Sequence, residues 1–457
     1  MFSFEDFADG KVDSGYIGSR SAEMEALFSS TLRVNLPGKT ATELQAIANT
    51  LKTTPTDQSV RDIVYQVTQH SKFARNALRA NKFTLNLEGG EPTFTNVTVE
   101  AGSLLLAYSV KIESLVKYKE LEAMGLTASS LIGQQVDMKM PLVPEGLLTR
   151  VGTKCSSDFD ENRAAVPTDE LRIDNMFYYW DPARTGCTLA ATDLADGHYK
   201  VTSLNPTISV YPEYDKLVAD GKVTMVQIYG QIEHGDLTSS DWGWHSYNDI
   251  KGLLTSQQGF KVTQTFPDNK GVRLEKTMPN GLKVEVDMLT PVSFADHVDP
   301  AVSNAAFRDA MRTHELVYYA GHAFYGSLTV LDEPTAYPAN TYQIIFMDAC
   351  WSYAYYTKQV FRNKATASDP LGWALVDVVN NTEMGITGSE RTAAVLWQNT
   401  LAGADAVFAH KSAKRYSWNN MIQYMHEHAQ RRADASGEKN PEIYGASGVR
   451  TNVYKPL

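Results

Sequence analysis

The spacing of apolar residues changes character along the chain. Thr40-Ala41-Thr42-Glu43 has the Thr-x-x-Glu spacing of a capping box, and it precedes a run with helical periodicity that residues 58–78 continue. Residues up to about Arg79 are therefore predicted to form a helical scaffold. From Lys82 the pattern becomes an alternation of apolar and polar positions with glycines at the turns, which predicts β-strands as far as Tyr211.

A second change of pattern falls between residues 205 and 221. Beyond it, short apolar runs alternate with helical stretches, which indicates a parallel sheet covered by helices on both faces. The predicted strands are residues 222–229, 260–266, 316–320, 342–347 and 382–387, and the predicted helices are residues 246–257, 303–312, 391–401 and 417–432. Asn280-Gly281 predicts a type I′ hairpin turn, and a small hairpin is expected from residue 327.

These patterns predict three regions in a chain of 457 residues, which is too long for one hydrophobic core. Residues 1–80 are expected to be helical, residues 81–212 to form a β-rich domain of unknown role, and residues 213–457 to form an α/β domain. No internal repeat is present.

Composition narrows the classes of partner. The formal net charge of −11 argues against a nucleic-acid backbone as the partner and suits cationic peptides. No apolar run reaches the roughly 18 residues that a membrane-spanning helix needs, and residues 1–10 lack the features of a signal peptide. We expect a cytoplasmic protein without a membrane span, although the sequence is also compatible with an exported form whose signal has been removed.

The three cysteines, Cys155, Cys187 and Cys350, leave at least one free thiol. A bond between Cys155 and Cys187 is expected only in an exported form. No wider disulfide framework is indicated.

Two reactive residue types follow apolar strands of the second half directly. His322 comes after residues 316–320 and Cys350 after residues 342–347, where an α/β sheet gathers its ligands. A nearby imidazole favours the thiolate that makes cysteine a nucleophile, and the backbone N–H groups of Ala323 and Cys350 are candidates to bind an oxyanion. Either residue alone is more often structural, but packing explains the pair less easily.

The same residues carry a resemblance to a known family. Tyr319-Ala320-Gly321-His322-Ala323 and Ile345-Phe346-Met347-Asp348-Ala349-Cys350-Trp351-Ser352 resemble the strand–Gly-His and strand–Asp-x-Cys motifs of the caspase-like cysteine peptidases. This group includes caspases, metacaspases, legumains, gingipains and clostripain-like enzymes. The resemblance covers roughly residues 222–400.

The resemblance implies a caspase-like fold and a His/Cys dyad. His322 would be the general base and Cys350 the nucleophile of a cysteine endopeptidase that acts on protein or peptide substrates through an acyl-enzyme. Asp348 stands two residues before the nucleophile, as in metacaspases and clostripain-like enzymes, where this position lines the pocket for Arg or Lys; its alternative role is to cap the following helix. A catalytically inactive caspase-like module that binds protein partners is the alternative function.

Weaker candidates lie in two loops. The loop after residues 222–229 contains Glu233, His234, Asp236 and Asp241 and is a candidate wall of the pocket, with Asp236 predicted to contact substrate. Ser389 and Glu390 are predicted to line the cleft; the alternative for Ser389 is a helix cap.

No cofactor is required by this chemistry, and no metal ligands are assigned. Asp158, Asp160 and Asn162 have the spacing of a calcium loop, but Arg163 stands where that loop needs glycine. Some members of the resembling group use calcium, so the resemblance leaves room for calcium at a different site.

Overall fold

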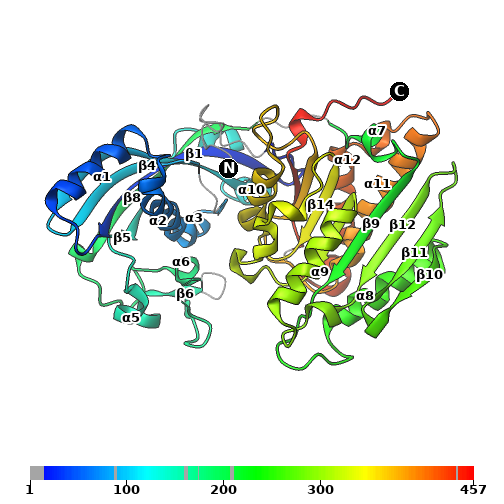
Figure 1. The fold of residues 1–457 in the computed structure, drawn as a ribbon, viewed down its shortest axis with the longest axis horizontal. Helices are drawn as coiled ribbons and strands as arrows, with labels where there is room; N and C mark the ends of the chain where they lie inside the picture. The colour runs from blue at the N-terminus through cyan, green and yellow to red at the C-terminus, as the bar shows by residue number, and fades with distance from the viewer. Residues whose placement is uncertain (1–14, 87–89, 159–162, 173, 206–209, 439–440) are drawn as a thin grey trace. The chain divides into compact units, whose positions relative to one another are not determined.

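The computed structural model of the chain describes residues 15–86, 90–158, 163–172, 174–205, 210–438 and 441–457, which fold into two compact units (Figure 1). The first unit comprises Ala22–Asn205, and the second combines Pro206–Leu457 with Ser14–Ser21. The division lies at the start of the interval in which the sequence predicts a boundary. Each unit contains helices and a sheet, so the fold is mixed α/β.

The first unit is built on a six-stranded sheet of order β2-β4-β1-β8-β5, with β3 paired to β4. Its strands are β1 (Ser21–Asn35), β2 (Phe83–Leu85), β3 (Thr93–Glu100), β4 (Ser103–Lys117), β5 (Gln135–Pro141) and β8 (Leu194–Leu204), and a separate small pair joins β6 (Ser157–Asp158) to β7 (Ala164–Ala165). The helices are α1 (Ala41–Thr53), α2 (Arg61–Ser71), α3 (Arg75–Ala80), α4 (Tyr118–Ala123), α5 (Leu147–Val151) and α6 (Met176–Tyr179).

Strand β1 corrects the prediction that residues 1–80 are helical. Ala26 and Phe28 in β1 are buried while Leu27 between them is 40% exposed, so burial follows the two-residue period of a strand. The pairing of β1 with β8 also places residues of the predicted regions 1–80 and 81–212 in one sheet. The predicted helices after residue 40 are present, and Thr40 and Glu43 make both bonds of the capping box.

A disulfide joins Cys155 and Cys187 in the first unit. Cys155 is fully buried, and Cys350 is the free cysteine among the three. The two bonded residues are 32 positions apart, and closing a loop of that size restricts the unfolded chain. The chain-entropy relation gives a stabilisation of about 3 to 4 kcal/mol.

We predict that replacing both Cys155 and Cys187 by serine lowers the free energy of unfolding of the first unit by about 3 kcal/mol. Urea unfolding followed by hydrogen exchange of peptides from residues 22–205 measures this loss. Peptides of the second unit serve as the internal control. Unchanged exchange in residues 22–205 would show that the bond does not stabilise this unit.

The second unit is built on an eight-stranded sheet of order β10-β11-β12-β9-β13-β14-β15-β16. Its strands are β9 (Lys222–Tyr229), β10 (Lys261–Phe266), β11 (Gly271–Thr277), β12 (Lys283–Leu289), β13 (Leu316–Ala320), β14 (Gln343–Asp348), β15 (Val376–Asn381) and β16 (Tyr444–Ser447). Strands β12, β9, β13, β14 and β15 pair in parallel, and the edges of the sheet are antiparallel.

The helices of this unit are α7 (Tyr214–Leu217), α8 (Trp242–Gly252), α9 (Pro300–Thr313), α10 (Ser352–Lys364), α11 (Glu390–Phe408) and α12 (Trp418–Ser436). Within the described ranges, no helix has the length and apolar character needed to cross a membrane.

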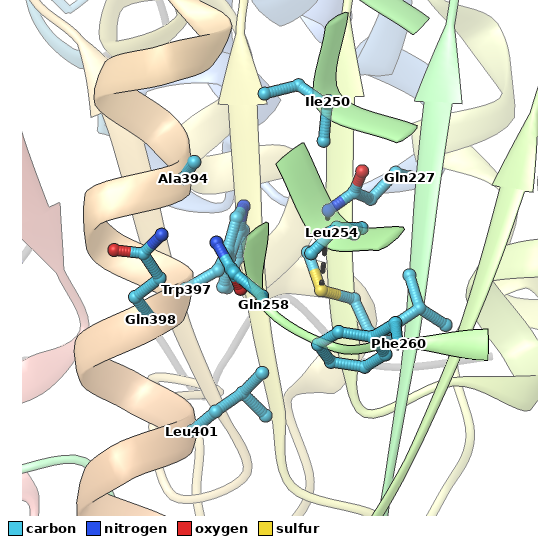
Figure 2. Close-up of a pocket in the computed structure, with 11 residues that line it drawn as sticks. Gln227, Ile250, Leu254, Gln258, Phe260, Ala394, Trp397, Gln398 and Leu401 are labelled. Carbon is cyan, nitrogen blue, oxygen red and sulfur yellow. Dashed lines mark hydrogen bonds between the residues drawn. The ribbon is translucent and has the colours of Figure 1, made fainter. Parts of the chain in front are cut away.

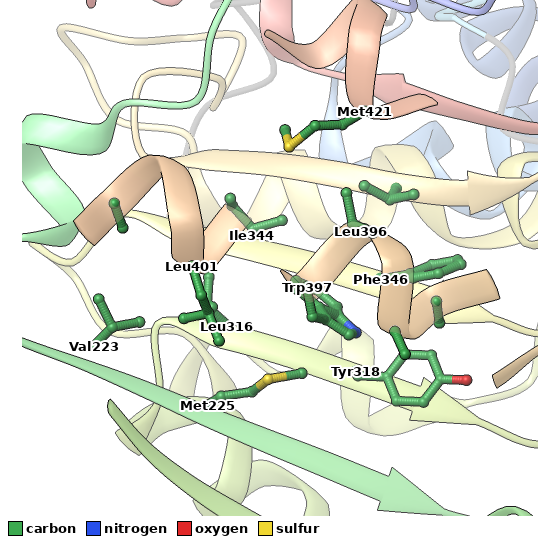
Figure 3. Close-up of a cluster of buried hydrophobic side chains, with 14 of the residues drawn as sticks. Val223, Met225, Leu316, Tyr318, Ile344, Phe346, Leu396, Trp397, Leu401 and Met421 are labelled. Carbon is green, nitrogen blue, oxygen red and sulfur yellow. The ribbon is translucent and has the colours of Figure 1, made fainter. Parts of the chain in front are cut away.

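Two successive residues of β13 show that helices cover both faces of this sheet. Tyr318 packs against Trp397 of α11, and its neighbour Tyr319 packs against Phe307 of α9. Since successive side chains of a strand point to opposite faces, α9 and α11 lie on opposite sides. Figure 3 shows the α11 side of the core, where Trp397 and Leu401 pack over side chains of β9, β13 and β14.

Three local predictions in this unit are wrong. Strand β15 ends at Asn381, so residues 382–387 form a loop: the Thr382 N–H turns to the Ile443 carbonyl, and the Glu383 carbonyl accepts the Trp351 N–H. The expected hairpin from residue 327 is a series of 3₁₀ turns. The turn at residues 280–281 is not type I′, because only its glycine has a positive φ.

Candidate functional site

The carboxyl ends of four neighbouring parallel strands meet at one edge of the second sheet. Ala320 of β13 is in register with Tyr229 of β9 and with Asp348 of β14, and Met347 is in register with Asn380 of β15. His322 and Cys350 therefore each follow a paired strand end by two residues. Adjacent strands are about 4.8 Å apart, so the loops that carry these two residues leave the sheet side by side.

The backbone around His322 is held by two tyrosines. Tyr319 donates its hydroxyl to the His322 carbonyl at 3.0 Å, and Tyr356 donates to the Ala323 carbonyl. A Cβ at Gly321 would lie 2.4 Å from the Tyr319 hydroxyl, so only glycine fits where the chain leaves β13. Gly321 is thus explained by Tyr319, whose hydroxyl holds the turn at His322.

The His322 ring is oriented by a backbone carbonyl. Nε2 of His322 lies 2.7 Å from the carbonyl oxygen of Ile232, in the loop that follows β9. A carbonyl only accepts, so Nε2 carries the proton and Nδ1 keeps the lone pair that a general base needs. His234 of the same loop stacks on His322 with ring centroids 5.3 Å apart.

Cys350 lies in the turn after β14, the strand next to β13, and is partly buried. Its Sγ is 3.8 Å from the Gly385 carbonyl, in the loop after β15. Burial raises the pKa of the Cys350 thiol, and the carboxylate of Asp348 raises it further against the lowering effect of Gly385. Within the described residues, the hydrogen bonds of the thiol and of the His322 ring go to these carbonyls and not to each other.

Strained backbone flanks both residues. Phe324 and Tyr325 after His322, and Trp351 after Cys350, have φ values of 46°, 53° and 47°, in the left-handed region that costs a residue with a side chain. Such conformations gather at functional sites, where the surrounding structure enforces them. The same conformation also occurs away from these strand ends, at Asp268 and His410 for example, so it supports a functional site only together with the placement of His322 and Cys350.

The N–H groups predicted to bind an oxyanion differ in their surroundings. In the described part of the chain, the Ala323 N–H donates to no backbone carbonyl, whereas the Cys350 N–H contacts its own thiol and lowers the pKa of that thiol. Both N–H groups lie beside the positions predicted for the reaction. Their assignment to an oxyanion hole stays a prediction.

Asp348 is the centre of a buried hydrogen-bond network. Its Oδ1 accepts from Asn381 at 2.7 Å, and its Oδ2 accepts from Tyr318 and Ser389, each at 2.9 Å. Burial raises the pKa of Asp348, while these three hydrogen bonds lower it and limit the rise. The alternative role of Asp348 as a helix cap is not found, because α10 begins without a side-chain cap. Ser389 occupies the N-cap position of α11, as the alternative for this residue predicts, but its hydroxyl donates to Asp348 and makes no capping bond.

Carboxylates gather near Asp348. Glu390 is buried and accepts from Ser246 at 3.2 Å, and burial raises its pKa, with a further rise caused by Asp348. Glu442 is also buried, and burial raises its pKa to about 7 although it pairs with Arg432. Burial is the first cause of the upward shifts in pKa of Asp348, Glu390 and Glu442, and Arg432 lowers the pKa values of Asp348 and Glu442.

The remaining predicted residue, Asp236, is exposed in the loop after β9. No contact among the described residues joins it to His322 or Cys350. The carboxylate that organises this loop is Asp241, which accepts the N–H groups of Ile232 and Glu233. Sequence reasoning noticed Asp241 in a polar cluster but missed Ile232, because a backbone carbonyl has no signature in the sequence.

Two hollows lie elsewhere. A cavity of about 20 Å³, the size of one water molecule, is enclosed by α8, α11 and the sheet, where Gln258 and Trp397 face it (Figure 2). An open hollow of about 480 Å³ lies on the first unit, lined in part by Arg33 and His198. Neither contains a residue predicted for the site.

Comparison with protein-family models, with curated proteins and with solved structures finds no match for this chain. In the described ranges, no group of three or more His, Cys, Asp or Glu side chains is arranged to hold a metal ion. Asp160 and Asn162, of the calcium-like spacing, lie outside the described residues.

We predict that Asp348→Ala lowers the free energy of unfolding of the second unit by about 3 kcal/mol, because it leaves the buried donors of Tyr318, Asn381 and Ser389 without an acceptor. Urea denaturation measures this change. Asp236→Ala, at an exposed position, is the matched control and should change stability by less than about 0.5 kcal/mol. Equal losses in the two variants would contradict the network.

Proposed function

We propose that the chain is a cysteine endopeptidase in which Cys350 is the nucleophile and His322 the general base. The observation that carries the proposal is the register of β13 with β14. Because their last residues are paired, the loops that contain His322 and Cys350 begin next to each other. The Ile232 carbonyl supports it, since it leaves Nδ1 of His322 free to take a proton. The resemblance of the two strand-end motifs to caspase-like peptidases points to the same chemistry.

The reaction follows from these groups. His322 Nδ1 takes the thiol proton as Sγ of Cys350 attacks the carbonyl carbon of the scissile peptide bond, and the N–H groups of Ala323 and Cys350 bind the oxyanion. His322 then gives the proton to the leaving amine as the C–N bond breaks, which leaves a thioester. Water, deprotonated by His322, hydrolyses the thioester and restores the thiol.

The raised pKa of Cys350 bears on the timing of proton transfer. A buried thiol beside a carboxylate is protonated in the resting protein at neutral pH. The proposal therefore assigns His322 the role of a base that acts during attack, not that of a partner in a preformed ion pair. Substrate that displaces water from the strand ends would bring the two groups together.

A preference for Arg or Lys before the cut follows from the charges near Asp348. Asp348, Glu390 and Glu442 are buried carboxylates, and their pKa values are all raised. A cationic side chain placed beside Asp348 would repay the cost of burying these charges. Arg432 already pairs with Glu442, so the support for a basic residue at that position comes from the buried carboxylate of Asp348.

The disulfide bears on the compartment. Bonds such as Cys155–Cys187 are typical of proteins that fold in oxidising surroundings. We therefore favour the exported form over the cytoplasmic one.

The competing candidate is a catalytically inactive module that binds protein partners. It is favoured by the hydrogen bonds of Cys350 and His322, which go to carbonyls of neighbouring loops in place of each other. Under this reading, the thiol is a packed group with a raised pKa and no base acts on it.

Hydrolysis of fluorogenic peptides separates these candidates. With Arg- or Lys-ending peptides, tested with and without calcium, we expect turnover that Cys350→Ala and His322→Ala each reduce at least about a thousandfold. His198→Ala, which alters an exposed histidine of the first unit, is the control. Absence of Cys350-dependent turnover on Arg-, Lys-, Asp- and Asn-ending peptides alike would leave the binding module as the better account.

Specificity is tested separately by Asp348→Asn. Loss of one charged hydrogen-bond partner is expected to lower kcat/KM for Arg-ending peptides about 10- to 100-fold. We expect iodoacetamide to alkylate Cys350 in this variant as well. This control would show that the thiol is still accessible. An unchanged preference for arginine would assign its recognition to other residues.

A further inference from the structure

One peptide group links His322 to a buried carboxylate. The carbonyl of Ile232 accepts the His322 Nε2–H at 2.7 Å, and the N–H of the same peptide group, which belongs to Glu233, donates to Asp241 Oδ2 at 2.8 Å. In a trans peptide the carbonyl and the N–H point in opposite directions. Asp241, the peptide group and the imidazole therefore form one continuous chain of hydrogen bonds.

Asp241 accepts further hydrogen bonds besides the one from the Glu233 N–H. It is 2% exposed and also accepts the N–H groups of Ile232 at 3.0 Å and of Gly243 at 2.7 Å, the latter as the cap of α8. A Cβ at Gly243 would lie 2.1 Å from the Gly230 carbonyl, so the cap packs tightly against the base of the loop. Helix capping alone would not require the two bonds to residues 232 and 233.

The two neighbouring carboxyl groups, Asp241 and Glu233, have pKa values that are shifted in opposite directions. Burial alone would raise the pKa of Asp241, but hydrogen bonds from the Glu233 side chain and from backbone amides outweigh burial and lower it. The neighbouring Glu233 has a raised pKa, caused first by its side-chain contact with Asp241. Of the two carboxyl groups, Asp241 is the one that is more readily ionised.

We propose that Asp241 is a positioning residue for the dyad, which orients the Ile232 carbonyl toward His322 and increases its negative charge through the shared peptide group. The inference rests on the proposed function and deepens it. A carboxylate that accepts a peptide N–H polarises the carbonyl at the other side, and hydrogen bonds linked in this way strengthen one another. The more negative carbonyl stabilises the imidazolium that forms when His322 takes the thiol proton.

Other charged groups face this chain of bonds. His234 stacks on His322 with an interplanar angle of 9°, and its Nδ1 lies 3.2 Å from Asp296. Asp296 also accepts the Gly235 N–H at 3.1 Å, which holds the far side of the loop. Asp296 contacts the loop without touching the peptide group between Ile232 and Glu233, so the polarising role belongs to Asp241.

The test is Asp241→Asn, which removes the charge and keeps both an acceptor oxygen and a side chain well suited to cap α8. We expect kcat on an Arg-ending peptide to fall about tenfold while KM changes less than about twofold, as for other residues that orient a reacting group at one remove. Asp299→Asn is the matched control, because Asp299 caps α9 in the same way and makes no contact with the loop among the described residues. Asp241→Ser provides a second neutral cap should the asparagine variant be poorly folded, as judged by thermal unfolding.

Alkylation of Cys350 by iodoacetamide at pH 7 is the second readout, and it requires no substrate. We expect His322→Ala to slow alkylation and Asp241→Asn to slow it by a smaller factor. Slowing by His322→Ala together with wild-type alkylation and wild-type kcat in Asp241→Asn would overturn the role of Asp241 and leave the dyad intact. Alkylation that is indifferent to His322→Ala, together with no hydrolysis, would overturn the proposed function and this inference with it.

Discussion

The pairing of Ala320 with Asp348 is the constraint on which the rest of the site depends. Because β13 and β14 run in parallel and in register, the chain reaches His322 and Cys350 after the same number of residues beyond the edge of the sheet. A shift of register by one residue would turn either loop to the other face. The buried side chains of β13 and β14, packed between α9 and α11, make such a shift costly and so fix the relative positions of His322 and Cys350.

Backbone groups contribute as much to the site as side chains do. The Ile232 carbonyl orients His322, the Gly385 carbonyl faces the Cys350 thiol, and the Glu383 carbonyl accepts the N–H of Trp351. Each comes from a loop that follows a parallel strand, so the sheet assembles the site from separate parts of the chain. The left-handed conformations that follow His322 and Cys350 are the cost of turning the chain so sharply at a strand end.

The sequence predicts the features that depend on local pattern. The apolar runs of β9, β13 and β14 and the capping box of α1 lie where they were expected, as do His322 and Cys350 at strand ends. Strand β1 was missed, because its partner β8 lies more than 150 residues away and its alternation is visible only once one face is buried. The sequence predicts a strand where the loop after β15 lies. Strand β15 ends because the next residues make hydrogen bonds to Trp351 and Ile443, which are remote in sequence.

The contacts that the site residues make with distant parts of the chain could not be predicted from local sequence pattern either. The contacts of Asp348 with Tyr318, Asn381 and Ser389 come from three further elements, so its burial and its network required the folded structure. The disulfide was foreseen only as one option, since spacing does not determine whether Cys155 and Cys187 meet.

The most direct test of the account is covalent trapping with a short peptidyl chloromethyl ketone that ends in arginine. Mass spectrometry of the intact protein and of its peptides would locate the adduct. The account predicts a single adduct on Cys350 that forms faster than with the matching aspartate- or leucine-ending reagent and more slowly in His322→Ala. An adduct rate that depends neither on the peptide nor on His322, or the absence of an adduct on Cys350, would contradict a peptidase site at these strand ends.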